Sequence, residues 1–334
     1  SQNDPKGWLQ RYMDAIYSPF WRREFDAEDL DAVVAVLAQI GAPTDGFVAF
    51  AQGDGAAFND KAQSNTFDAG VYGVPTYQLL EHSDRRGVPA QFFGREHLPR
   101  IAALLANQER PLPDVAYALP ADLDDLALEK CASVPGVSQS QQSLPVYFDF
   151  ASPNSYLALP ALMQLKAQGT ALSWHPFDHK PLKKPASFAA DEDRAARHRR
   201  VRGEYIALDI QRYAPHPLRD IYLHIECASA NLGLIWLQQI APARVDDYVC
   251  RIFRQLWRDH VDISDLSVIT EQLQQILGEA EFAPTHWHDF VQSSGSDALD
   301  KVYDKASELG VTYAPTFFLG EEPFQGRAQL PLIS

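Results

Sequence analysis

The residues with the clearest chemical potential are a serine and a proline that follow a short apolar segment. Ser152 and Pro153 follow Val146–Phe150, an aromatic run typical of a buried strand, after one intervening residue, Ala151. Serine followed by proline is a typical helix start, with serine as the N-cap. The unpaired N–H groups and partial positive charge at such a start favour a thiolate over a thiol. Taken alone, the pattern is more typical of an ordinary helix cap than of a functional serine.

The elements around this serine alternate between strand and helix. The helix extends to about Gln168, and Ala171–Pro176 is predicted to be a second strand. A long polar and helical region covers Asp191–Leu309. The chain then returns to strand at Thr316–Leu319, turns, and pairs back through Pro323–Gln325. The predicted order is strand, helix, strand, helical insert, hairpin and helix. This is the order of a thioredoxin-like α/β fold with an all-helical insertion.

Three blocks of sequence occur twice, in the same order and at similar spacing. The matched pairs are Trp21–Leu30 with Trp257–Leu266, Gly70–Tyr77 with Gly310–Phe317, and Phe93–Pro99 with Gln325–Pro331. Chance is a poor explanation for three ordered matches, so we interpret them as a tandem duplication of one domain.

The two copies differ in extent. The second begins near Leu144 and holds about a hundred residues before Trp257, whereas twenty residues precede Trp21 in the first. The first copy therefore lacks what the second carries between about Leu144 and Val245. Two explanations stay open, a truncation of the protein itself or a leading segment that the given sequence omits.

These matches set the expected domain organisation. Pro and Ser/Gln-rich composition marks a linker between the copies. The expected parts are a partial first copy at 1–107, a linker at 108–143 with one short acidic helix at Ala121–Cys131, and a second thioredoxin-like domain at 144–334 with its helical insert at about 186–309.

Several segments resemble one known family. Asp149–Ala158, DFASPNSYLA, resembles the opening signature of 2-hydroxychromene-2-carboxylate isomerases and kappa-class glutathione transferases. Gly310–Leu319 resembles their G-V-x-G-V-P-T-F-F-x segment, and Trp257–Arg258 with Asp262–Asp265 resembles a block of their helical insert. The resemblance covers nearly all of the second copy and about Gly7–Leu105. It implies a DsbA-like thioredoxin fold and glutathione as cofactor.

The resemblance also assigns roles at the reactive position. The family serine before the proline hydrogen-bonds the sulfur of bound glutathione, and this role falls on Ser152. Pro315 resembles the cis-proline that faces the active helix, with the main chain of Ala314 open to pair with the glutathione backbone. The alternative for Pro315 is an ordinary trans proline that starts an edge strand.

Further glutathione contacts are conserved only in part. Lys183 stands at a family asparagine, and Arg202 replaces a lysine that binds the glycyl carboxylate, although each alone is more typical of a solvated basic residue. After the glycine of the last hairpin, Arg327 and Ala328 replace the Ser-Asp or Gln-Asp pair that holds the γ-glutamyl end. Loss of that charge-assisted contact weakens the binding free energy of glutathione by about 1.5–3 kcal/mol. Glu96 keeps an acid in the first copy, and Arg327 stays an expected cofactor-binding residue.

Three functions follow as hypotheses. The leading one is a glutathione-dependent isomerase or transferase that acts on a small unsaturated, aromatic keto-acid-like substrate by thiolate addition and elimination. The alternative is a non-catalytic tandem thioredoxin-like protein that binds a small thiol or a partner. A disulfide oxidoreductase is excluded, because Ser152 and Ser155 stand where thiol–disulfide exchange needs a thiolate.

The composition is that of an ordinary globular protein, with 46% hydrophobic and 22% charged residues among 334. A net charge of −15 argues against nucleic acid and anionic membranes as partners, so we expect a small-molecule substrate and leave a homodimer open. Three distant cysteines, with neither C-x-x-C nor zinc spacing, predict no metal site and a reduced, cytoplasmic protein. No leader or membrane-spanning segment is recognised.

Overall fold

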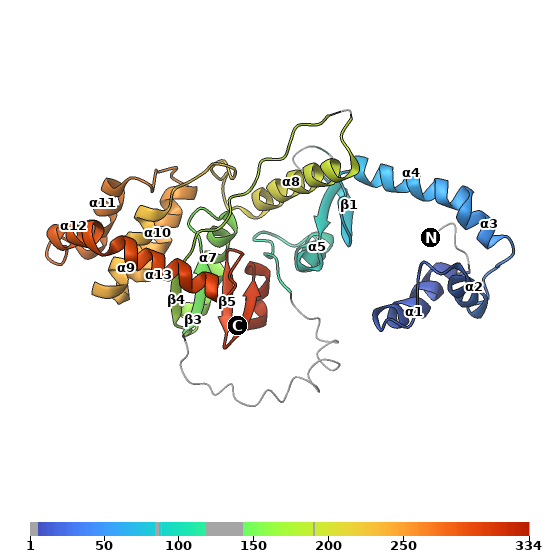
Figure 1. The fold of residues 1–334 in the computed structure, drawn as a ribbon, viewed down its shortest axis with the longest axis horizontal. Helices are drawn as coiled ribbons and strands as arrows, with labels where there is room; N and C mark the ends of the chain where they lie inside the picture. The colour runs from blue at the N-terminus through green and yellow to red at the C-terminus, as the bar shows by residue number, and fades with distance from the viewer. Residues whose placement is uncertain (1–5, 84–86, 88, 118–142, 190, 334) are drawn as a thin grey trace. The chain divides into compact units, whose positions relative to one another are not determined.

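The computed structural model describes residues 6–83, 87, 89–117, 143–189 and 191–333. The chain divides into two compact units, Ser1–Tyr72 and Gly73–Ser334, which we describe separately (Figure 1). The predicted linker helix Ala121–Cys131 lies outside the described residues. Within these ranges, no helix has both the length and the apolar character that crossing a bilayer requires.

The first unit consists of helices. They are α1 (Trp8–Trp21), α2 (Leu30–Gln39), α3 (Phe47–Gln52) and α4 (Asp54–Asp68). Asp29 caps α2 by accepting the Asp31 N–H at 2.9 Å. Among the described side chains of this unit only Val33 is buried, and Trp21 is 78% exposed. The unit therefore has a very small core of its own.

A four-stranded sheet forms the centre of the second unit. Its strands are β3 (Leu144–Phe148), β4 (Leu172–Pro176), β5 (Thr316–Leu319) and β6 (Glu322–Gln325), in the spatial order β4-β3-β5-β6. β3 and β4 run parallel and are joined by α7 (Pro153–Ala167), while β5 pairs antiparallel with both β3 and β6. A parallel pair needs a crossover helix, which α7 provides. The predicted α/β thioredoxin-like fold is confirmed.

In the described part of the chain between β4 and β5, six α-helices follow one another. They are α8 (Arg194–Tyr213), α9 (Ala228–Ile240), α10 (Val245–Trp257), α11 (Leu266–Leu277), α12 (Pro284–Ser293) and α13 (Gly295–Glu308). Figure 1 shows α9 to α13 gathered at one side of the sheet, with α8 extending away from them. They fall inside the predicted helical insert.

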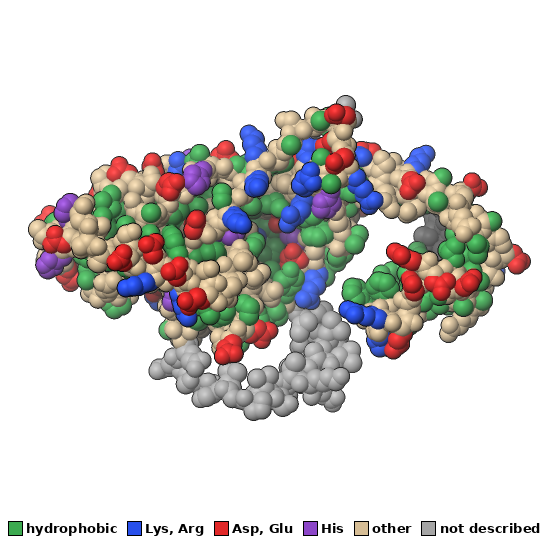
Figure 2. All heavy atoms as spheres, viewed as in Figure 1, with side chains coloured by type: hydrophobic (Ala, Val, Ile, Leu, Met, Phe, Trp, Pro, Cys, Tyr) green, Lys and Arg blue, Asp and Glu red, His purple; other side chains and the backbone are tan. Residues whose placement is uncertain are grey.

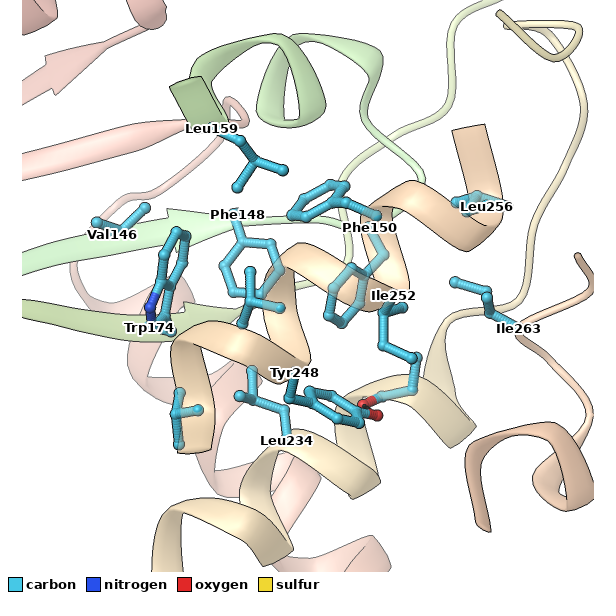
Figure 3. Close-up of a cluster of buried hydrophobic side chains, with 14 of the residues drawn as sticks. Val146, Phe148, Phe150, Leu159, Trp174, Leu234, Tyr248, Ile252, Leu256 and Ile263 are labelled. Atoms are coloured by element: carbon cyan, nitrogen blue, oxygen red, sulfur yellow. Dashed lines mark hydrogen bonds between the residues drawn. The ribbon is translucent and has the colours of Figure 1, made fainter. Parts of the chain in front are cut away.

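The core of the second unit joins this insert to the sheet through aromatic side chains (Figure 3). Phe148 and Phe150, at the end of β3, pack against Phe253 of α10 with ring centroids 5.6 and 4.9 Å apart. Trp257 is fully buried and donates its Nε1–H to the Phe150 carbonyl at 2.9 Å. The insert therefore fixes the backbone that leads directly into α7.

A second hairpin in this unit belongs to the predicted first copy. Its elements are β1 (Thr76–Ser83), β2 (Pro89–Phe93), a 3₁₀ turn at Arg95–His97 and α5 (Leu98–Leu105). The C-terminal hairpin continues in the same way, into a 3₁₀ turn at Arg327–Gln329 and α14 (Leu330–Ile333).

The two hairpins share their local backbone geometry. Gly94 donates its N–H to the Pro75 carbonyl at 3.0 Å, and Gly326 donates to the Pro315 carbonyl at 2.8 Å. Both glycines have positive φ, 101° and 87°, which suits a residue without Cβ. This similarity supports the third pair of matched blocks, and the tandem duplication itself stays a prediction.

Trp257 gives a test of how the insert holds the sheet. Trp257→Phe leaves the buried Phe150 carbonyl without its donor and opens a small cavity. We therefore expect the free energy of unfolding to fall by about 2–3 kcal/mol. The matched control is Trp21→Phe, because Trp21 occupies the equivalent block but is exposed, and we expect a change within about 0.5 kcal/mol. Urea unfolding followed by far-UV circular dichroism measures both. Equal losses in the two variants would contradict this assignment.

Candidate active site at the start of α7

Ser152 is the N-cap of α7, as predicted. Its φ and ψ are −87° and 115°, and its Oγ accepts the Ser155 N–H at 3.3 Å. Pro153 takes the first helical position, where a missing N–H costs nothing. The Ser152 hydroxyl therefore lies at the positive end of a 15-residue helix.

The Ser152 hydroxyl faces the residue that precedes Pro315. The Ala314–Pro315 peptide bond is cis, so the alternative of an ordinary trans proline is wrong. Ser152 Oγ donates to the Ala314 carbonyl at 3.2 Å. The Ala314 main chain was expected to lie open to a peptide ligand. Instead, Ala314 is 1% exposed and its carbonyl is already hydrogen-bonded to Ser152, because the start of β5 packs directly against the start of α7.

Arg327 reaches the same helix start through Asn154. Its Nη1 donates to Asn154 Oδ1 at 2.8 Å, and Asn154 Nδ2 donates to the Tyr313 hydroxyl at 3.1 Å. The Nε of Arg327 lies 3.2 Å from both carboxylate oxygens of Asp114. Arg327 is 7% exposed, and its Nη2 is buried without a hydrogen-bond partner among the described residues. A buried, partly unsatisfied guanidinium is suited to an additional anionic acceptor.

Lys183 and Arg202 lie on the surface. Both are exposed, and within the described parts of the chain neither takes part in a salt bridge. Their segments are adjacent, because a Cβ built on Gly203 of α8 would stand 3.1 Å from the Pro185 Cβ. Figure 2 shows Lys and Arg side chains over α8. Within the residues that the structure describes, the side-chain hydrogen bonds of Ser152 involve Ala314 and Ser155, and neither cation.

Asp149 is a further residue of the site, and no role was predicted for it from the sequence. It follows β3 directly, is 4% exposed, and accepts the Ala151 N–H at 2.8 Å and the His179 N–H at 3.3 Å. Burial raises the pKa of Asp149 to about 6 and raises that of the neighbouring Cys227 thiol well above its usual range. An acid at the end of a buried apolar strand was the available signal in the sequence.

A second polar cluster docks the first hairpin on α8. His97, from the turn before α5, has its Nδ1 2.7 Å from the Tyr213 hydroxyl and its Nε2 3.3 Å from the Tyr205 hydroxyl. Arg212 donates to the Gln91 carbonyl of β2 at 2.6 Å. Burial lowers the pKa of His97 to about 4, although the Glu96 carboxylate opposes the shift. These partners are more than a hundred residues apart, and no spacing in the sequence indicates them.

Residues after α5 connect the two hairpins at equivalent positions. The Ala116 N–H donates to the Glu96 carbonyl at 2.9 Å, and the Tyr117 N–H donates to the Ala328 carbonyl at 2.8 Å. Glu96 and Ala328 occupy matched positions of the two similar segments Phe93–Pro99 and Gln325–Pro331. This part of the predicted linker is thus packed against both hairpins, and Asp114 just before it binds Arg327.

Residues 143–334 match the family model described as the DSBA-like thioredoxin domain. The chain belongs to this family. It is 30% identical over 196 residues to the 2-hydroxychromene-2-carboxylate isomerase of Pseudomonas sp. (strain C18), covering 56% of this chain and 86% of that protein. The enzyme of the same name from Pseudomonas putida is 25% identical over 188 residues, with coverages of 56% and 90%.

One similar solved structure is a selenomethionine form of 2-hydroxychromene-2-carboxylate isomerase. It has a TM-score of 0.43 and 25% identity, and the match covers 57% of this chain and 92% of that one. The predicted family resemblance is confirmed by the sequence matches. They also confirm the expectation of an isomerase-type enzyme, because both relatives carry that name.

Ser152, the N-cap, and Ser155, in the first turn of α7, allow the cap to be tested by measuring the free energy of unfolding. Ser152→Ala removes the acceptor of the Ser155 N–H and the donor to Ala314, so we expect a loss of about 1–2 kcal/mol. Ser155→Ala is the control, because the Ser155 hydroxyl is buried without a partner in the described structure, and its removal should be neutral or stabilising. Urea unfolding measures both, and a larger loss for Ser155→Ala would contradict the cap geometry.

The His97 cluster predicts a pH dependence. Because the folded-state pKa of about 4 lies below the ordinary value of 6.5, the unfolded chain binds more protons between these values. The contribution of His97 to the free energy of unfolding is therefore fully present above pH 6.5. It decreases by on the order of 3 kcal/mol as the pH falls towards 4. His97→Gln should remove this loss, while His224→Gln, at an exposed residue, should keep it. Urea unfolding at pH 7.5 and 5 compares them, and an unchanged slope in His97→Gln would refute the assignment.

Proposed function

We propose that this protein is a glutathione-dependent isomerase of a small, unsaturated, aromatic keto acid. The observation that carries the proposal is the meeting of the Ser152 hydroxyl with the Ala314–Pro315 segment at the start of α7. The names of the two sequence relatives supply the reaction class and the type of substrate. The matches to this chain cover 86% and 90% of the length of these two relatives.

The residues at the start of α7 fit a thiol-containing tripeptide. The helix end and the Ser152 hydroxyl favour an anionic sulfur. Arg327 adds a buried donor, Nη2, that has no partner among the described residues and lies next to Asn154 in the first turn of α7. A carboxylate of the ligand would satisfy this donor, with a short movement of the side chains that cover it.

When bound, glutathione supplies a thiolate that adds to the conjugated double bond of the substrate, permits rotation about the resulting single bond, and is eliminated. In a transferase the same thiolate would stay bonded to the product, and the neighbouring carbon would take up a proton. Either outcome depends on a low pKa of the bound thiol, which the protein must provide.

The contribution of Ser152 is an exchange of hydrogen bonds. In the ligand-free site its hydroxyl donates to the Ala314 carbonyl. On binding, the hydroxyl turns to donate to the sulfur, and the released carbonyl becomes an acceptor for a peptide N–H of the ligand, as in strand addition. One hydroxyl rotation thus prepares both the sulfur contact and the peptide contact.

Cationic residues would hold the carboxylates of the ligand and the substrate. We assign Arg327 to a carboxylate at the buried end of the site, where it is fixed by Asp114 and Asn154. Lys183 and Arg202 are exposed on adjacent segments and are assigned to a carboxylate that arrives from solvent. Because Lys183 and Arg202 are exposed to solvent and Arg327 is buried, we expect them to contribute less to binding than Arg327.

Glutathione binding tests the proposal directly. We expect saturable quenching of intrinsic fluorescence at millimolar glutathione or below, and a rise in thiolate absorbance near 240 nm on binding at pH 7. Ser152→Ala should bind with similar affinity but lose most of the thiolate signal, and Ser155→Ala should retain it. Absence of saturable binding at millimolar glutathione would contradict the proposal and favour a non-catalytic tandem protein.

Activity is measured with 2-hydroxychromene-2-carboxylate, the compound that appears in the names of both relatives. Its conversion is followed by the ultraviolet spectrum, with and without glutathione. Conversion that requires both glutathione and Ser152 is the expected result. Conversion at equal rate without glutathione would refute the cofactor assignment while leaving the isomerase intact.

A further inference from the structure

Two loops meet at the carboxyl ends of the parallel strands β3 and β4, where α/β folds usually bind ligands. One loop contains Ala151 and leads into Ser152, and the other contains Phe177–Lys180. Asp149 lies between them and accepts one backbone N–H from each, at 2.8 Å from Ala151 and 3.3 Å from His179. Its carboxylate therefore connects the reactive turn to the opposite loop.

The surroundings of Asp149 do not resemble those of a structural ion pair. The titratable groups that face it are the Cys227 thiol at the start of α9, the Tyr303 hydroxyl of α13 and Asp178 on the second loop. His179 contributes its backbone N–H. Within the described residues no cation forms a salt bridge with Asp149. A buried carboxylate without a cation is costly, and here backbone N–H donors compensate it.

The second loop also reaches the proline side of the site. The ring of His179 lies edge-on to Tyr313, with centroids 5.8 Å apart, and Tyr313 precedes Ala314. Asn154 of α7 donates to the hydroxyl of the same tyrosine. A displacement of the His179 loop would therefore shift the Tyr313–Ala314 segment against which Ser152 is set.

We propose that Asp149 is a positioning residue, whose two carboxylate oxygens hold the Ser152 turn and the His179 loop at a fixed separation so that the Ser152 hydroxyl meets its acceptor in the correct direction. This inference rests on the proposed function and assigns no contact with the substrate to Asp149. Each loop bonds a different oxygen of the carboxylate, Oδ1 for Ala151 and Oδ2 for His179, so replacing either oxygen removes one of the two connections.

The decisive variant is Asp149→Asn, which preserves the side-chain shape but replaces one acceptor oxygen by a donor. We expect glutathione to bind to it with an affinity within about threefold of wild type. We also expect the thiol pKa of bound glutathione, read as 240 nm absorbance against pH, to rise by up to one unit, a tenfold loss of thiolate. Asp178→Asn is the matched control, because it removes the same charge from an exposed neighbour.

The outcomes separate the two proposals. If Asp149→Asn and Asp178→Asn give the same thiol pKa as wild type, the positioning role is overturned even if Asp149→Asn melts at a lower temperature. Loss of a negative charge by itself lowers the pKa of a nearby thiol, so an equal fall in both variants would show only a general charge effect and would overturn the positioning role as well. If wild-type protein binds no glutathione, the proposed function fails, and the test below still decides on the connection between the loops.

A measurement on wild-type protein needs no variant to fold. Burial raises the pKa of Asp149 to about 6, so the carboxyl becomes protonated as the pH falls through that value and accepts fewer hydrogen bonds. Amide exchange protection of Ala151 and His179, corrected for intrinsic rates, should fall together between pH 7 and 5. Independent behaviour of the two amides would overturn the proposal.

Discussion

The hydrogen bond from the Ser152 hydroxyl to the Ala314 carbonyl joins residues 162 positions apart, and the candidate site depends on it. It forms because β5 pairs with β3, which brings the segment before Thr316 to the end of β3 where α7 begins. The same hydroxyl accepts the Ser155 N–H. One side chain therefore serves as the cap of α7 and as its contact with the segment that leads into β5.

The residues before Ser152 are fixed by the helical insert. Phe148 and Phe150 pack on α10, and the Phe150 carbonyl accepts the buried Trp257 indole N–H. Asp149, between the two rings, points to the opposite side and accepts backbone N–H groups from both loops. Alternation along an extended segment explains this division, since successive side chains point to opposite faces. The insert thus acts as a rigid support for a small polar site.

Charge is distributed unevenly around this support. Arg327 is buried against Asp114 and Asn154, whereas Lys183 and Arg202 are exposed. Asp114 belongs to the segment after the first hairpin, so that segment contributes to the environment of the C-terminal domain. His97 belongs to the same hairpin, and its burial between two tyrosines shows that the hairpin is packed on α8. The first hairpin and the segment after it are therefore part of the structural context of the site.

Local patterns in the sequence determined the helix start at Ser152, the order of strands and helices, and the family blocks, because each depends on neighbouring residues or on a period of the chain. Only the tertiary structure decided that the Ala314 carbonyl is occupied, that Asp149 connects two loops, and that Arg327 binds Asp114. The physical reason is distance along the chain. Each of these contacts is set by how the sheet, the insert and the hairpins pack, and neither residue of such a pair carries a sign of its partner.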